Sequence, residues 1–219
     1  MKYFIAITLS LVLLVGLLSC KKDRFTANGN VVAETREVGQ FSGISSTGST
    51  SVKVIYGTTF KVVVKGSSNL VPQFATRVVN DILYLSFEDI NVRNDDIEVV
   101  LTMPTIAKIV VSGDSEIDLK GNFPELPTLD ISLSGSAEVE AENLMQIAQV
   151  NVEISGAAEV DFEDVLVKRA ETNISGSGEV KFQVQDNLKA KISGSGKVYY
   201  KGNPTIQQDI SGSGKLIKF

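Results

Sequence analysis

The chain has 219 residues, of which 43% are apolar, and its formal net charge is −5. This size and composition suit a globular protein with its own hydrophobic core, and the net negative charge argues against a nucleic-acid-binding protein. Histidine is absent, which excludes any mechanism that pairs a serine or cysteine nucleophile with histidine. We predict no cofactor and no dedicated metal site.

The N-terminus has the features of a bacterial lipoprotein signal. A charged start precedes an apolar run over residues 4–18, shorter than the ~20 residues that a membrane-spanning helix needs. The run ends in the sequence L-L-S-C, which resembles the lipobox, and its last residue is Cys20. As the only cysteine of the chain, Cys20 cannot form an intramolecular disulfide. We predict a signal peptide over residues 1–19 and lipid attachment at Cys20.

A polar tether is predicted for residues 20–37, beginning with the charged sequence K-K-D-R after the cysteine. The residue directly after the cysteine is lysine rather than aspartate, which is compatible with sorting to the outer membrane of a Gram-negative cell. We therefore expect an outer-membrane lipoprotein that is exposed either on the cell surface or to the periplasm.

Residues 38–219 are predicted to form a single domain, whose first part, 38–110, consists of leading coils and hairpins. Phe41 and Ile44 are the expected buried anchors of an otherwise polar stretch. The pair Asn80-Asp81 tolerates the left-handed conformation of a tight hairpin turn. The strands expected over residues 52–56 and 60–64 form either a hairpin or two successive strands, and a short helix is an alternative near residues 69–74. Strands are expected over residues 52–56, 60–64, 74–79, 82–87 and 97–103.

From residue 111 onward a seven-residue phrase, I-S-G-S-G-E-V in its clearest form, occurs six times. The copies begin at Val111, Leu133, Ile154, Ile174, Ile192 and Ile210. Their spacings of 22, 21, 20, 18 and 18 residues are too short for a propeller blade or a helical hairpin and suit one coil of a β-solenoid. The predicted fold class is therefore all-β: residues 38–219 form a parallel β-helix with about 18–22 residues per coil, and its N-terminal segment is rich in β-strands.

Each position of the phrase has its own expected role. The third is always glycine, as a corner with positive φ requires, at Gly113, Gly135, Gly156, Gly176, Gly194 and Gly212. The fifth is always small, and the seventh and ninth positions are expected to point inward as apolar columns. The ninth column contains aromatic residues, which we interpret as packing rather than as a sugar platform. The second position is always serine, which we assign to hydrogen bonding along a ladder and to turn formation.

Charged residues form two outward columns after the corner. Seven carboxylates share this strip: Glu116, Asp118, Glu138, Glu140, Glu159, Asp161 and Glu179. The plain interpretation is a solvated face that keeps the solenoid soluble. The alternative is a site for a divalent cation or a basic partner, because carboxylate oxygens are the ligands that calcium prefers. Lysines follow the strip toward the C-terminus, so a head-to-tail contact between copies of the chain is also open.

The six corners, together with F-S-G-I at 41–44, V-K-V-I-Y-G at 52–57 and V-N-D-I-L at 79–83, resemble the auto-transporter adhesin head (GIN domain) family, DUF2807. The resemblance covers about residues 38–217. It implies a right-handed parallel β-helix similar in shape to pectin lyases, without their catalytic residues, and a role in adhesion.

Three functions are open on this basis. The favoured one is a non-enzymatic, membrane-anchored module for adhesion or contact with an unknown protein or glycan partner. The runner-up is a polysaccharide-active β-helix enzyme, although Arg169 is the only arginine after residue 110. The third is a purely structural envelope lipoprotein.

Overall fold

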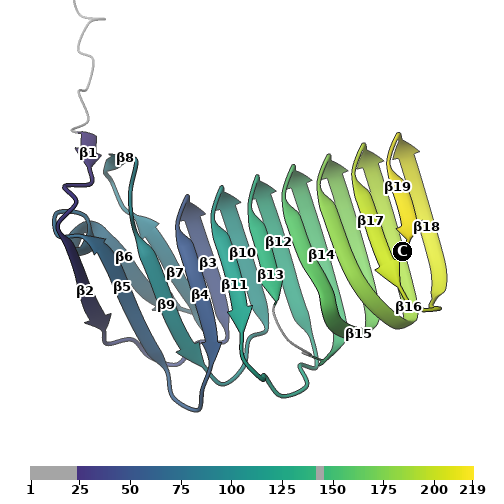
Figure 1. Ribbon diagram of the computed structural model, residues 1–219, viewed down its shortest axis with the longest axis horizontal. Helices are drawn as coiled ribbons and strands as arrows, with labels where there is room; N and C mark the ends of the chain where they lie inside the picture. Colours follow the sequence, from purple (N-terminus) through teal and green to yellow (C-terminus); the bar gives the residue numbers. More distant parts are fainter. Residues whose placement is uncertain (1–23, 142–145) are drawn as a thin grey trace, which may run out of the picture.

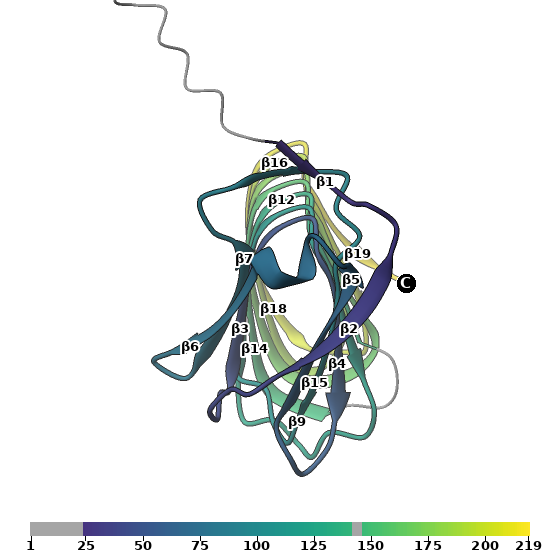
Figure 2. The same cartoon turned by 90° about the vertical axis from the view of Figure 1, so that its left-hand side faces the viewer.

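The computed structural model describes residues 24–141 and 146–219, and these residues form a β-solenoid. Successive coils stack along one axis, so that strands distant in sequence lie side by side (Figure 1). Viewed from the N-terminal end, the coils enclose a narrow interior between two faces (Figure 2). The all-β solenoid predicted from the repeat is confirmed.

The first face, here called the serine face, contains the strands that end in the S-G of the phrase, preceded by two strands from the N-terminal part. In spatial order it consists of β7 (Ile82–Phe87), β3 (Gly43–Gly48), β10 (Lys108–Gly113), β12 (Leu129–Gly135), β14 (Gln146–Gly156), the second halves of β15 (Glu159–Gly176) and β16 (Glu179–Gly194), and β18 (Thr205–Gly212).

The second face, here called the acidic face, contains the strands that follow each corner. In spatial order it consists of β2 (Val31–Arg36), β5 (Lys61–Ser67), β9 (Glu98–Met103), β4 (Ser51–Tyr56), β11 (Glu116–Lys120), β13 (Glu138–Ala141), the first halves of β15 and β16, β17 (Lys197–Lys201) and β19 (Lys215–Lys218). Three strands and one turn of 3-10 helix complete the fold: β1 (Arg24–Thr26), β8 (Asn91–Arg93), β6 (Phe74–Val79) and η1 (Val71–Gln73).

The register of the repeat coils places equivalent residues over one another. Ile154, Ile174 and Ile192 are in line on neighbouring strands, and all three are buried. The predicted aromatic column is also inside, since Phe162 and Phe182 are fully buried with ring centroids 6.5 Å apart. Like residues therefore bury one continuous apolar stripe, which confirms the packing interpretation of the aromatic column.

The six corner glycines all have positive φ, between 110° and 131°. The backbone of each coil crosses closely over the one before it. A Cβ on Gly176 would lie 2.3 Å from the carbonyl oxygen of Gly156, which also accepts a 2.8 Å hydrogen bond from the N–H of Ser177. Glycine is required at these corners by both conformation and space.

The N-terminal part differs in one respect from a simple hairpin arrangement. Strands β4 and β5 do not pair with each other, because β9 lies between them, parallel to β4 and antiparallel to β5. Residues 52–56 and 60–64 therefore form two successive strands and not a hairpin. The hairpin predicted around Asn80 and Asp81 is confirmed. Strands β6 and β7 pair antiparallel there, and the two turn residues have φ of 50° and 61°.

The folded part begins earlier than the predicted tether allows. Within residues 20–37, β1 pairs parallel with β8, and β2 pairs antiparallel with β5. The tether prediction is therefore wrong for residues 24–26 and 31–36. These strands were missed because β2 is exposed along most of its length and shows no alternation of apolar and polar residues.

The N-terminal predictions, the signal peptide over 1–19 and the lipid attachment at Cys20, lie outside the described residues. Within the described ranges, no helix is long and apolar enough to cross a membrane.

Candidate functional site

The predicted acidic strip is assembled on the acidic face in two columns. Glu116, Glu138, Glu159 and Glu179 are in line on successive strands, and Asp118, Glu140 and Asp161 form the second column beside them. The structure therefore brings all seven carboxylates onto one surface.

Lysines neutralise the C-terminal half of this strip. Lys181 Nζ lies 2.9 Å from Glu159 Oε1 and 2.6 Å from Asp161 Oδ2. Its hydrogen bonds to Asp161 and Glu159 raise the pKa of the Lys181 ammonium. Lys197 pairs with Glu179 in the same way on the next coil. At the other end Lys120 Nζ lies 3.7 Å from Asp118 Oδ2. In the described part of the chain, the carboxylates that have no nearby lysine are therefore concentrated around Glu138.

Burial and the neighbouring carboxylates both change the pKa of Glu138. Partial burial raises the pKa of its carboxyl, and the carboxylates of Glu159, Glu140, Glu116 and, least, Asp118 raise it further. Among the residues of 24–141 and 146–219, no three His, Cys, Asp or Glu side chains are placed to hold a metal ion together. Contact of the strip with a divalent cation or with a basic partner stays a prediction.

We expect Glu138→Gln to increase the free energy of unfolding at pH 7 by roughly 0.5 kcal/mol, a small gain because solvent screens these charges. The folded pKa lies above the unfolded one, so ionisation costs the folded state more. That cost is present above the folded pKa and disappears as pH falls below the unfolded pKa, about 4.3. Urea unfolding at pH 7 and pH 3 measures the difference.

The matched control is Glu153→Gln on the serine face, because Glu153 has Ser132 and Asn173 as its neighbours in register rather than carboxylates. This variant should match the wild type at both pH values. A gain for Glu138→Gln that persists at pH 3 would contradict an electrostatic cause.

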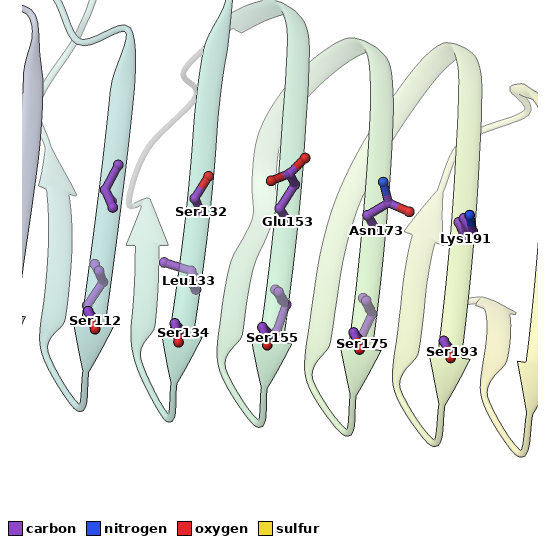
Figure 3. A pocket seen from close by; sticks show the side chains of 14 residues that line it. Ser112, Ser132, Leu133, Ser134, Glu153, Ser155, Asn173, Ser175, Lys191 and Ser193 are labelled. Atoms are coloured by element: carbon purple, nitrogen blue, oxygen red, sulfur yellow. The ribbon is translucent and has the colours of Figure 1, made fainter.

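A groove of about 460 Å³ runs across the serine face, perpendicular to the strands. One side is a row of serines from successive coils, and the other is the outward column two residues earlier on each strand (Figure 3). The serine row consists of Ser112, Ser134, Ser155, Ser175 and Ser193, and the facing column of Val110, Ser132, Glu153, Asn173 and Lys191.

The serines of this row do not bond to one another. Within the part of the chain that the structure describes, none of the row's hydroxyls has a side-chain hydrogen bond, and neither do Glu153, Asn173 or Lys191. The prediction of ladder hydrogen bonding is therefore wrong, and these groups point unpaired into the groove.

The next outward column of the same face is paired within the chain. Asn151 Nδ2 donates to Asp130 Oδ1 at 2.7 Å, and Lys189 Nζ donates to Glu171 Oε1 at 2.6 Å. On the serine face the groove therefore differs from this neighbouring column, whose residues Asn151, Asp130, Lys189 and Glu171 make hydrogen bonds within the chain. The sequence contained the signal for it, since serine is kept in all six copies at a position that faces solvent and is free of packing constraints.

The described surface offers little for catalysis. Arg169, the arginine that an enzyme of polysaccharides would need, donates through Nε to Gln149 Oε1 at 2.9 Å. The carboxylates of the acidic face are repeated from coil to coil rather than set apart as an acid and a base.

Three solved structures at 17–20% identity share the fold. A "putative adhesin" from Bacteroides fragilis NCTC 9343 has a TM-score of 0.71 and 17% identity, covering 89% of this chain and 100% of that one. "Putative adhesins" from Parabacteroides merdae ATCC 43184 and Parabacteroides distasonis ATCC 8503 have TM-scores of 0.55 and 0.57, identities of 19% and 20%, and coverage of 90% of this chain and 99% and 100% of theirs. No curated protein sequence matches this chain.

The family comparison covers most of the solenoid. Residues 40–204 match the family described as "Putative auto-transporter adhesin, head GIN domain", DUF2807. The match includes both hairpin strands of the N-terminal part and five of the six corners, from Gly113 to Gly194. This chain therefore belongs to that family of adhesin head domains.

Proposed function

We propose that this protein is a non-enzymatic interaction module, held in the outer membrane through a lipid on Cys20 and displayed at the cell surface. The observation that carries the proposal is the groove of the serine face, where a regular row of unpaired hydroxyls is presented by a rigid stack of strands. Hydroxyl groups donate and accept hydrogen bonds, so the row suits a protein or glycan partner of low charge.

Membership of an adhesin family supports contact rather than catalysis as the role. The absence of histidine from the sequence and the engagement of Arg169 with Gln149 count against the polysaccharide-active alternative.

The anchor proposal rests on the sequence. Cys20 ends an L-L-S-C phrase, and the first strand begins at Arg24, four residues later. Two or three acyl chains on Cys20 would hold the protein on a membrane essentially permanently, at ~0.8 kcal/mol per buried methylene. The folded module would then stand directly on the membrane.

Three strains test the proposal: one carrying the wild-type chain, one Cys20→Ala, and one with both Ser155→Lys and Ser175→Lys. We expect labelled palmitate to enter the wild type and the groove variant but not Cys20→Ala. Protease added to intact cells should remove the chain from the first and third strains. Adherence of cells to a surface coated with host or bacterial glycans and proteins should fall in the groove variant.

The outcomes separate the alternatives. A chain that resists external protease until the cells are lysed would favour a periplasmic structural role. Release of shortened products from a glycan panel by the purified chain would favour the enzyme. Palmitate retained in Cys20→Ala would end the lipoprotein proposal.

A further inference from the structure

The strand β2 is the outermost strand of the acidic face at the N-terminal end of the solenoid (Figure 1). It pairs with β5 on one side. Among the described residues, no strand pairs with its other side. An unpaired strand edge of this kind is a template for pairing with another chain.

The composition of β2 makes this edge unusually open. Five of its six residues are exposed, and the side chains of Val31 and Val32 are 58% and 42% exposed although they are apolar. The strand has neither lysine nor proline, which are common protective residues of natural edges, and its charged residues Glu34 and Arg36 lie in its C-terminal half. The last strand at the opposite end, β19, begins and ends with lysine, at Lys215 and Lys218.

The hydrogen-bonding pattern shows which backbone groups are available. The N–H of Ser68 donates to the carbonyl of Asn30 at 2.8 Å, in line with the antiparallel register of β2 and β5. In an antiparallel pair the direction of the backbone groups alternates, so the even-numbered residues of β2 face β5. The N–H and C=O groups that point to the free edge belong to Val31, Ala33 and Thr35.

We propose that β2 pairs antiparallel with β2 of a second copy of this chain, about a two-fold axis between the two Ala33 residues. Each copy then supplies three N–H and three C=O groups to the other, and Val31 lies opposite Thr35. Such a contact uses the same patch on both copies and closes as a dimer. The two acidic faces become one continuous sheet.

The side chains of β2 are compatible with this register. Ala33 at the axis is small, so the two backbones can approach closely. Glu34 lies opposite Val32 of the other copy, and Arg36 opposite Asn30, so no like charges face each other. Burial of the exposed valines on both sides of the joint adds apolar area to the hydrogen bonds. A second copy is therefore the occupant that fits this edge.

The variant Ala33→Pro tests the proposal with the full-length chain in detergent. Proline removes one N–H from the free edge and leaves the ladder with β5 intact, a substitution that edge strands tolerate. Sedimentation equilibrium in density-matched detergent should give a dimer for the wild type and at least about tenfold weaker association for Ala33→Pro. The melting temperature should stay within a few degrees. Ala33→Ser, which keeps the N–H, should dimerise like the wild type.

A wild type that is still monomeric at a chain concentration of about 100 μM would overturn the proposal, because the dissociation constant of the dimer would then lie above that concentration. Dimerisation of Ala33→Pro at wild-type strength would do so too, because it would place the contact elsewhere. Should Ala33→Pro fail to fold, Val31→Lys replaces it, since a charge on the exposed edge must also weaken the dimer. None of these results depends on palmitate labelling or on the groove variant, so the two proposals stand or fall separately.

Discussion

Replacing Gly176 by alanine is expected to reduce the free energy of unfolding by about 3–5 kcal/mol, because two penalties coincide at this corner. With φ at +131°, the backbone has a conformation that residues with a side chain rarely adopt. The added Cβ would also lie 2.3 Å from the oxygen of Gly156 and 3.1 Å from its carbonyl carbon. Denaturant unfolding followed by circular dichroism measures the loss.

Gly48→Ala is the matched control, because it separates conformation from crowding. Gly48 lies in the same column, in register with Gly113, and has φ of +107°. A Cβ built there meets nothing within 4 Å. This variant should therefore lose only the conformational part, about 1–2 kcal/mol. Equal losses for the two variants would mean that the close stacking of coil upon coil does not restrict the corner.

Truncation of Phe182 to alanine should cost about 3–5 kcal/mol, the range for a fully buried phenylalanine. Its side chain has no exposed surface, and its ring meets that of Phe162 at an interplanar angle of 69°. Because the two rings belong to adjacent coils, the loss falls on the interface between repeats as well as on one coil. Thermal and urea unfolding of the full chain report it.

Two further variants show whether the aromatic contact itself matters. A double-mutant cycle with Phe162→Ala should give a coupling of about 0.5–1.5 kcal/mol beyond the loss of buried area. Phe219→Ala removes a ring that is 47% exposed and that contacts Tyr199, and should cost less than about 1 kcal/mol. A loss for Phe182→Ala as small as that for Phe219→Ala would contradict the packing role of the column.

The solenoid part of the fold was determined by the sequence itself. Each coil packs on the next, so the same contact recurs at a nearly constant separation along the chain and appears as a period in the sequence. The buried positions of Val139 and Val160, the positive φ of Gly156 and the line of carboxylates from Glu116 to Glu179 could all be predicted from that period.

The tertiary structure alone decided two things: the strand order of the N-terminal part, where the sequence has no period, and the side-chain partners, which the period does not predict. In the N-terminal part, β9 inserts between β4 and β5, and β2 joins the edge, because pairing there depends on contacts that no repeat encodes. The neutralisation of Asp161 by Lys181 and the freedom of the Ser155 hydroxyl depend on distances between coils. A linear pattern gives the column to which a residue belongs, whereas only the folded chain fixes whether a neighbour is near enough to bond.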